Sequence, residues 1–307
     1  MLSCMVRREH AHEQSIWACC WAKPEPTSTD EFLITGSLDN TIKIWKWDDV
    51  DVRQMYCLEQ HNLGVISLDA RPTNSSMLVS SGMDCSLQVW DIPSGTAAHP
   101  QPIQAGLVDS WTVAVSPDCL TLATGSHGGK VHLYNTDSGE KETTLESGGK
   151  FMLSLAYSND GKYLASGSSE GIMYVWDCES GSLLHTMEGH AMAIRALTFS
   201  LDGRMLFSGS DDKYIKMHDL GSASHPVGTL PGHLGWVTSL SASPDGSRIA
   251  SGSSDQTARV WDLVNRQVVH TFKEHTDQVW GVRFNASGSR LASVSDDRSL
   301  AIYSTPF

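Results

Sequence analysis

The chain has 307 residues, 40% of them hydrophobic, and a formal net charge of -13 at neutral pH. This composition can fill a buried core, and the acidic charge disfavours direct binding to nucleic-acid phosphates. The seven cysteines are odd in number and lack a CxxC spacing, which argues against a zinc or disulfide framework and indicates a reducing compartment. Neither a secretory signal nor a membrane span is expected, because no apolar run reaches about 18 residues.

Short hairpin-like segments follow one another along the chain. Runs of β-forming residues flank a polar turn in residues 162–177, 204–219 and 247–262. Asp-Gly turns, SNDG at 158–161 and SPDG at 243–246, precede the first and third of these hairpins. No segment shows a sustained helical apolar period. The sequence therefore predicts an all-β protein.

The third run of each unit ends on an aromatic ring or a histidine, at intervals of 42 to 45 residues. The equivalent residues are Trp45, Trp90, Tyr134, Trp176, His218, Trp261 and Tyr303. A fixed period of this length is typical of repeat architectures in which each repeat is one small sheet. Seven units cover nearly the whole chain.

Polar residues recur at fixed distances before each ring. Ten residues upstream stand the hydroxyls Thr35, Ser80, Thr124, Ser166, Ser208, Ser251 and Ser293. Six residues upstream stand Asp39, Asp84, Gly128, Glu170, Asp212, Asp255 and Asp297. A histidine lies further upstream in five units, as His12, His61, His190, His233 and His275, and the third and fourth units carry Gly106 and Gly148 instead.

This pattern resembles the WD-repeat family. The Trp-Asp signature stands at 90–91, 176–177 and 261–262, and Gly-His stands at 189–190 and 232–233. The resemblance implies a seven-bladed β-propeller with four antiparallel strands per blade. We expect one domain spanning residues 1–307, with repeats ending near residues 47, 91, 135, 177, 219, 262 and 304.

The two ends of the chain are expected to meet in one blade. The last unit, LAIYSTPF at 300–307, ends about where a third strand finishes. The missing outer strand of that blade should come from the N-terminus, near residues 5–8. This closure would leave few exposed sheet edges.

A Ser, a His and an Asp lie together in residues 232–262, which could be read as the parts of a hydrolase. A catalytic set needs one copy, whereas five units carry near-complete copies. The resemblance implies a structural hydrogen-bond chain inside each blade, from Trp to Ser or Thr, to His, and to Asp. No enzyme, metal site or cofactor is expected, and a propeller enzyme would need a single non-repeating polar cluster in the channel, which we do not expect here.

Partner binding is expected at the mouth of the central channel, on the face that carries the histidine loops. Three or five residues past the histidine position stand Trp17, Asp109, Trp111, Phe151, Arg195, Trp236 and Trp280. Tyr, Trp and Arg are enriched in interface hot spots. The alternative is that some of these rings pack between blades. The residue before each turn Asp, from Leu38 to Asp296, should lie on the same face.

Five segments point to one subfamily: 61–70, 106–118, 148–167, 188–200 and 275–297. They resemble the small animal WD-repeat subunit of the superkiller (Ski) complex, which the polymerase-associated factor complex shares. The resemblance implies a non-catalytic scaffold with cytoplasmic and nuclear roles. Its partners would be a helicase and a tetratricopeptide-repeat protein in exosome-mediated 3′-to-5′ mRNA decay, and polymerase-associated factor subunits in transcription elongation and histone modification. No membrane and no direct nucleic-acid contact is implied.

Two other functions stay open at this point. The rim tryptophans could form an aromatic cage that reads modified histone tails or other peptides, and titration with methylated and unmethylated peptides would discriminate. A propeller enzyme is the second alternative, and the polar cluster described above would be its mark.

Overall fold

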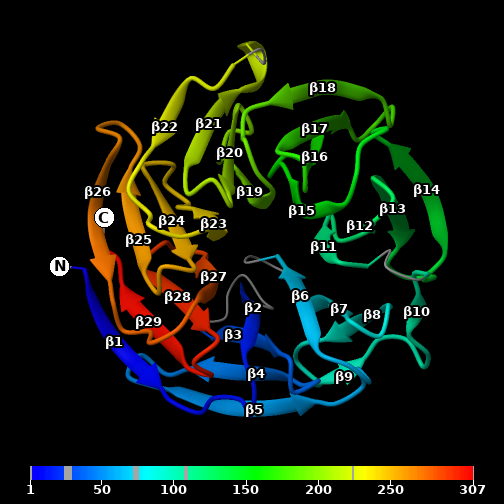
Figure 1. Ribbon diagram of the computed structural model, residues 1–307. Helices are drawn as coiled ribbons and strands as arrows, with labels where there is room; N and C mark the ends of the chain where they lie inside the picture. The colour runs from blue at the N-terminus through cyan, green and yellow to red at the C-terminus, as the bar shows by residue number, and fades with distance from the viewer. Residues whose placement is uncertain (1, 24–29, 72–75, 107–109, 223–224, 307) are drawn as a thin grey trace.

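The computed structural model describes residues 2–23, 30–71, 76–106, 110–222 and 225–306. Seven sheets stand as blades around a central axis (Figure 1). Each blade has four antiparallel strands, except that the outer strand of the second blade is split into two short pieces, β9 and β10, which both pair with β8. The predicted seven-bladed all-β propeller is confirmed.

The strands occupy four concentric positions. The innermost strands are β2 (Ile16–Ala22), β6 (Val65–Ala70), β11 (Thr112–Val115), β15 (Met152–Tyr157), β19 (Ile194–Phe199), β23 (Val237–Ala242) and β27 (Val279–Phe284). The second strands are β3 (Glu31–Ser37), β7 (Met77–Gly82), β12 (Thr121–Gly125), β16 (Tyr163–Ser168), β20 (Met205–Ser210), β24 (Arg248–Ser253) and β28 (Arg290–Ser295).

The third strands carry the repeated ring near their ends. They are β4 (Ile42–Trp47), β8 (Ser86–Asp91), β13 (Lys130–Asn135), β17 (Ile172–Asp177), β21 (Ile215–Asp219), β25 (Ala258–Asp262) and β29 (Leu300–Ser304). The outer strands are β5 (Val52–Leu58), β9 (Thr96–Ala97) with β10 (Ile103–Gln104), β14 (Lys141–Glu146), β18 (Leu183–Glu188), β22 (Gly228–Leu230), β26 (Gln267–Phe272) and β1 (Ser3–Arg8). A short 3-10 helix, η1 (Leu220–Ser222), follows β21.

We number the blades 1 to 7 by their innermost strands, from β2 to β27. Blade 7 joins the two ends of the chain, because β1 pairs antiparallel with β29. The register places Val6 opposite Ile302 and Arg8 opposite Leu300, with a bulge between Cys4 and Val6. The predicted closure by the N-terminal segment is confirmed, and β29 is therefore not a free edge.

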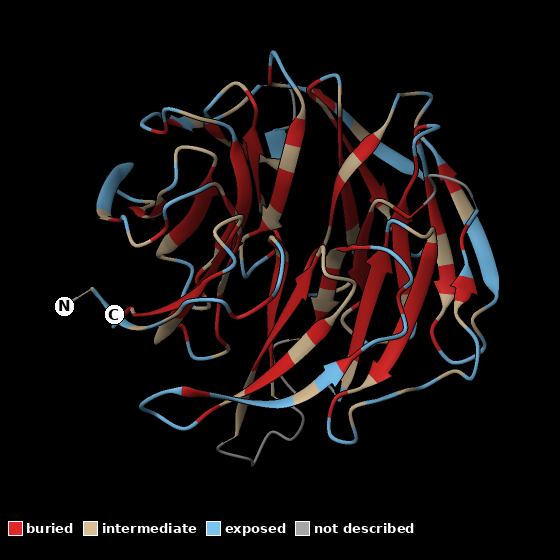
Figure 2. Ribbon diagram, turned by 60° about the horizontal axis from the view of Figure 1, so that its bottom comes forward, coloured by how far each residue is buried: buried red, intermediate tan, exposed pale blue. Residues whose placement is uncertain are grey.

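The apolar core lies between blades rather than inside them. One cluster joins Ile44 of blade 1 to Leu68 and Trp90 of blade 2, and a corresponding cluster fills each of the other six blade junctions. A small sheet cannot cover both of its own faces, so neighbouring blades cover them. Buried strands form the body of each blade in Figure 2, and outer strands carry much of the exposed surface.

The innermost strands of neighbouring blades are linked by side chains. Ser239 and Ser241 Oγ of β23 accept hydrogen bonds from the backbone N–H groups of Val282 (3.1 Å) and Phe284 (3.0 Å) in β27. The axis-facing edge of an innermost strand has no further strand to pair with, so its N–H groups need other acceptors. These links help to fix the geometry of the channel wall.

Candidate interaction face and central channel

The polar repeat forms a continuous hydrogen-bond chain in blade 6. Trp261 Nε1 donates to Ser251 Oγ at 2.8 Å, Ser251 Oγ lies 2.7 Å from His233 Nε2, and His233 Nδ1 lies 2.9 Å from Asp255 Oδ2. The chain is fully satisfied when His233 is neutral, with Nδ1–H donating to Asp255 and Nε2 accepting from Ser251. Asp255 also accepts the backbone N–H of Leu234, which ties the histidine loop to the turn.

Burial and hydrogen bonding set the ionisation of this chain. Burial lowers the pKa of His233 below its ordinary 6.5, although the Asp255 carboxylate acts in the opposite sense. Burial would raise the pKa of Asp255, but hydrogen bonds from His233 and Thr257 hold that pKa well below its usual value. A neutral histidine beside a carboxylate is therefore the stable combination at neutral pH.

Four other blades contain the same chain, and two of them have another ring in place of the tryptophan. Blades 1 and 2 are complete, with Trp45 and Trp90 donating to Thr35 (2.9 Å) and Ser80 (2.8 Å). Their histidines contact the hydroxyl and the carboxylate through His12–Thr35, His12–Asp39, His61–Ser80 and His61–Asp84. Blade 5 has His218 in place of Trp, and its chain runs from His218 to Ser208, His190 and Asp212. Blade 7 has Tyr303, and its chain runs from Tyr303 to Ser293, His275 and Asp297.

Five buried copies of one arrangement cannot all be catalytic centres with separate substrates. Each histidine and hydroxyl of the chain is buried within its blade. Cys19, a separate residue in the channel wall, has its pKa raised to about 12 by burial. A thiol protonated to that extent is a poor nucleophile. The arrangement can hold strands and turns together, with its histidines and hydroxyls buried.

Three clusters with aromatic rings each bridge two blades, and each contributes at least one residue to the lining of the channel, among Trp17, Trp111, Arg195 and Trp280. The first joins blades 7 and 1. The rings of Trp17 and Trp280 lie with their centroids 4.8 Å apart, and Trp17 Nε1 donates to Asp296 Oδ1 at 3.2 Å. Both rings are half-buried. Trp280 Nε1 and Gln278 Oε1 are buried and have no hydrogen-bond partner within the described chain.

The second cluster joins blades 3 and 4. Trp111 contacts the edge of Phe151 at a centroid distance of 5.3 Å, and His127 lies 5.2 Å from the same phenyl ring. Edge-to-face packing of this kind is the favoured geometry for aromatic pairs. Three rings therefore form one compact patch, with Phe151 at its centre.

The third cluster joins blades 5 and 6. The Arg195 guanidinium lies over the Trp236 ring at 5.0 Å and also donates to both carboxylate oxygens of Asp211, at 2.9 Å for the Nη2 contact. Trp236 is 41% exposed, and its backbone N–H donates to Ser254 Oγ at 2.8 Å. A fixed arginine beside an exposed indole is typical of interface anchors.

We call these six residues, Trp17, Trp111, Phe151, Arg195, Trp236 and Trp280, the aromatic rim. The structure brings all six rim residues into pairwise contact as above. The residues just before the turn position of four units contact them, namely His127, Asp211, Ser254 and Asp296. Asp109 lies outside the described residues.

Sequence reasoning missed several exposed apolar residues on the histidine loops. Leu63, Met192 and Leu234 are 53%, 48% and 79% exposed, and each lies one or two residues past a repeat histidine. Their position next to the repeat histidine could have predicted this exposure, because an apolar side chain on that loop has little buried core to pack against. These residues extend the apolar surface around the rim.

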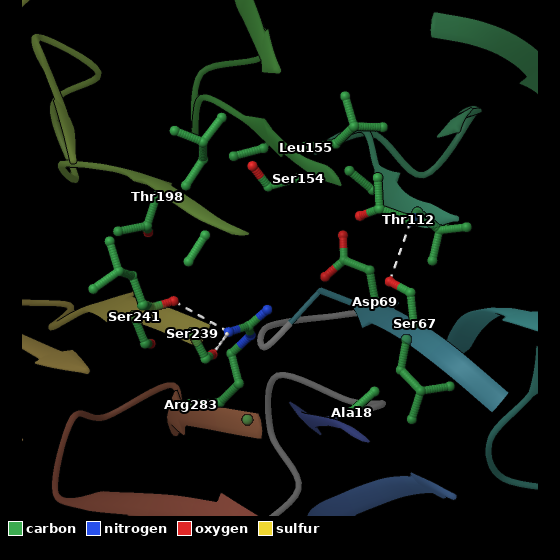
Figure 3. A pocket seen from close by; sticks show the side chains of 18 of the residues that line it. Ala18, Ser67, Asp69, Thr112, Ser154, Leu155, Thr198, Ser239, Ser241 and Arg283 are labelled. Atoms are coloured by element: carbon green, nitrogen blue, oxygen red, sulfur yellow. Dashed lines mark hydrogen bonds between the residues drawn. The ribbon is translucent and has the colours of Figure 1, made fainter. Parts of the chain in front are cut away.

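The channel itself is a cavity of about 430 Å³ lined by all seven innermost strands (Figure 3). Its wall carries Asp69 of β6 and Arg283 of β27, and Arg71 follows β6. The expectation that the channel holds no non-repeating polar cluster was wrong. The charged residues occupy positions where other blades carry small residues, so the repeat pattern gave them no emphasis.

The described residues contain no group of three or more His, Cys, Asp or Glu side chains that could hold a metal ion. They also include no helix with the length and apolar character to cross a bilayer.

Comparison with known proteins identifies the repeat. The family description "WD domain, G-beta repeat" matches residues 3–46, 52–91, 98–135, 139–177, 181–219, 224–262 and 266–304. Each match begins with the outer strand of the preceding blade, as expected for a ring closed by β1.

Two of the following three relatives are named as WD repeat-containing proteins. The WD repeat-containing protein SL1-17 of Schistosoma mansoni is 38% identical over 303 residues and covers 99% of both chains. The WD repeat-containing protein VIP3 of Arabidopsis thaliana is 40% identical over 164 residues, which is 49% of both chains. The meiotic recombination protein rec14 of Schizosaccharomyces pombe is 28% identical over 134 residues, 41% of this chain and 42% of its own.

Proposed function

Because this chain belongs to the WD-repeat family, whose members are typically non-catalytic interaction scaffolds, we propose that it holds partner proteins on its aromatic rim. The observation that carries the proposal is that repeated and unique residues lie in different places. The repeated histidines and hydroxyls are buried inside the blades, whereas the rim residues differ from blade to blade and four of them, Trp17, Trp111, Arg195 and Trp280, line the channel cavity. Recognition needs unique side chains at a surface, and a ring of identical groups cannot supply them.

The unpaired polar atoms of the rim support the same proposal. Buried donors and acceptors are nearly always paired in native proteins, so Trp280 Nε1 and Gln278 Oε1 are exceptions that call for a reason. A partner that shifts the Trp17–Trp280 pair would give both atoms the chance to bond. The cost of leaving them unpaired, about 1–3 kcal/mol each, would then be recovered on binding.

We further propose that the partners are those of the superkiller and polymerase-associated factor complexes. The support is the resemblance of the five segments named above to the subunit that the two complexes share. In this proposal the protein contacts a tetratricopeptide-repeat scaffold and a helicase in the cytoplasm and polymerase-associated factor subunits in the nucleus. It contributes no catalysis and needs no cofactor.

The acidic surface fits this assignment. A net charge of -13 repels phosphate backbones, so RNA handling would fall to the partners rather than to the propeller. The exposed acidic turns on the opposite face, such as those at Asp160 and Asp202, add to this repulsion.

Affinity purification with mass spectrometry tests the proposal. Trp111→Ala, Trp236→Ala and Trp280→Ala should each lose superkiller partners, because each removes one ring of a separate cluster. Leu201→Ala is the matched control, since Leu201 is 55% exposed on a turn at the opposite end of β19. Trp236→Ala should leave the melting temperature unchanged, because that ring is the most exposed of the six. Partner lists identical to those of the unmodified chain for all three variants would refute the rim assignment.

Peptide reading is a second candidate, favoured by the three-ring patch of Trp111, Phe151 and His127. Aromatic cages bind methylated ammonium groups through cation–π attraction. Calorimetric titration of methylated and unmethylated histone-tail peptides tests it. A preference for methylated peptide that Phe151→Ala abolishes would support this reading, and equal or absent binding of the two peptides would contradict it.

A further inference from the structure

The seven innermost strands carry one ring of equivalent positions that differ in charge. Strand register places Cys20, Asp69, Ala114, Ala156, Thr198, Ser241 and Arg283 at the same level. Five of these residues are small and uncharged. Asp69 and Arg283 stand on blades 2 and 7, which are separated by blade 1 alone. Figure 3 shows the carboxylate and the guanidinium both directed into the cavity.

The two charged groups are held in place by the wall but not by each other. Asp69 Oδ2 accepts the backbone N–H of Val115 at 2.8 Å. Arg283 Nη1 donates to Ser239 Oγ at 3.0 Å and to Leu240 O at 3.1 Å. Among the described residues no ion pair joins Asp69 to Arg283, and these hydrogen bonds to the wall use Asp69 Oδ2 and Arg283 Nη1. Each group therefore keeps bonding capacity toward the cavity.

Two further arginines bear on the electrostatics of the channel. Arg195 at the rim end is neutralised by the Asp211 carboxylate. Arg71, beyond the other end of β6, donates to the carbonyl oxygens of Val115 and Ser116 and has no carboxylate in contact within the described chain. Burial raises the pKa of Asp69, and the cations of Arg71 and Arg283 oppose that effect. Among the described residues of the channel, the Asp69 carboxylate thus lies in the field of two guanidinium groups, those of Arg71 and Arg283, that form no ion pair.

A ligand with one kind of charge does not suit this arrangement. An anion near Arg283 meets repulsion from Asp69, and a cation near Asp69 meets repulsion from Arg71 and Arg283. A ligand that carries both charges can bind the Asp69 carboxylate and the Arg283 guanidinium at once. An arginine side chain can present two parallel donors to a carboxylate. The cavity volume of about 430 Å³ lies within the range of small-molecule sites, about 300–1,000 Å³.

We propose that the central channel binds a small zwitterion of the amino-acid class, with its carboxylate on Arg283 and its ammonium group on Asp69. Four rim residues, Trp17, Trp111, Arg195 and Trp280, line the same cavity, but the proposal does not rest on the scaffold function. Its two charged contacts belong to blades 7 and 2, so a bound ligand would also tie these blades together across blade 1.

A length series of ω-amino acids tests the proposal with the full chain. Glycine, β-alanine, 4-aminobutyrate and 6-aminohexanoate would be titrated by calorimetry at millimolar concentrations, since they differ only in the separation of their charges. One length should bind best. Its N-acetyl and amide derivatives should bind with an affinity at least about tenfold lower, because each has lost one charge. No heat for any member, or equal binding of the derivatives, would overturn the proposal.

Two variants make the prediction more specific. Asp69→Asn keeps an acceptor for the Val115 N–H, so the fold should be retained. It should weaken the zwitterion about tenfold and strengthen the N-acetyl anion, because the repulsion is gone. Arg283→Gln should reverse the preference toward the amide-blocked cation. Thr198→Ala, at the same level but uncharged, is the matched control. Selectivity among the three ligands that is unchanged in Asp69→Asn would contradict the assignment.

Discussion

Blades 6 and 4 solve the same structural problem with different chemistry. In blade 6 a hydroxyl on the second strand, Ser251, is enclosed by Trp261 and His233. In blade 4 the histidine position is Gly148, and the equivalent hydroxyl, Ser166, donates instead to Met152 Sδ at 3.3 Å. Met152 is fully buried in the cluster between blades 3 and 4. A flexible thioether can therefore fill the place of a polar chain.

The two blades differ in how many hydrogen bonds are lost when one group is removed. The blade 6 chain is cooperative, since each donor satisfies the next acceptor, and one deletion leaves several buried groups unpaired. The blade 4 contact is a single weak hydrogen bond surrounded by apolar side chains. Blade 4 should thus tolerate polar substitutions that blade 6 does not.

The turn carboxylates provide the largest contrast. Asp255→Ala should lower the free energy of unfolding by about 3 kcal/mol, because His233 Nδ1 and the Leu234 N–H lose their acceptor in a buried site. The matched change Glu170→Ala in blade 4 should have little effect, since the one ion pair of Glu170 among the described residues is with the exposed Lys150. Urea denaturation of both variants measures the difference. Equal losses would show that the blade 6 chain adds nothing beyond a surface contact.

The hydroxyls give a smaller contrast. Ser251→Ala should cost about 2 kcal/mol, because the Trp261 indole N–H and the His233 ring lose a shared partner. Ser166→Ala should cost about 0.5 kcal/mol or less, since the Met152 sulfur needs no donor. The same denaturation series applies, with far-UV circular dichroism to check that both variants fold. A larger loss for Ser166→Ala would contradict the comparison.

Acid should separate the two blades further. The folded pKa of His233 lies below 6.5, so the unfolded chain binds the proton first as the pH falls. Stability of blade 6 is then complete above about pH 6.5 and declines below it, by at most about 1.4 kcal/mol per pH unit for this one histidine. The depressed pKa of Asp255 adds a further loss below its ordinary value of 3.8.

Hydrogen exchange measures this effect strand by strand. Protection factors, which correct for the intrinsic pH dependence of exchange, should fall in β24 and β25 between neutral pH and pH 5, while those of β16 and β17 stay level. A His233→Gln variant is the control, and its β24 protection should not depend on pH in this range. Parallel decline in blades 4 and 6 would indicate that the ring opens as a whole.

The fold was predictable because its sequence pattern recurs seven times along the chain. A pattern of hydroxyl, turn Asp and terminal ring, repeated at steps of 42 to 45 residues, averages out the loss of any one member, as Gly106 and Gly148 show. The closure by β1 followed from counting strands in the last unit. These inferences depend on local spacing, which a sequence displays directly.

The channel charges could not be predicted in the same way. Asp69 and Arg283 are 214 residues apart and belong to units whose other residues fit the pattern, so neither is distinctive alone. Their significance depends on the ring bringing blades 7 and 2 close to each other. The packing of Trp17 on Trp280 and of Arg195 on Trp236 likewise joins neighbouring blades, and side-chain geometry of that kind is set by tertiary structure rather than spacing.

The turn after each Asp gives the smallest difference between the blades. The next residue has a positive φ in all seven, and it is glycine in blades 3 and 4, as Gly129 and Gly171, but Gln256 in blade 6, with φ of 69°. A left-handed conformation strains a side chain with a Cβ atom, by roughly 1 kcal/mol or less for a single exposed residue, and glycine avoids the strain while losing more entropy on folding. The two terms nearly offset each other, so Gln256→Gly should raise the free energy of unfolding by about 0.5 kcal/mol. Gln256→Val, which places a branched side chain in the same conformation, should lower it, and urea denaturation of the pair resolves the sign. If Gln256→Gly is the less stable of the two, then the blade 6 turn is held by its Asp255 hydrogen bonds so firmly that backbone strain has no part in the difference between the blades.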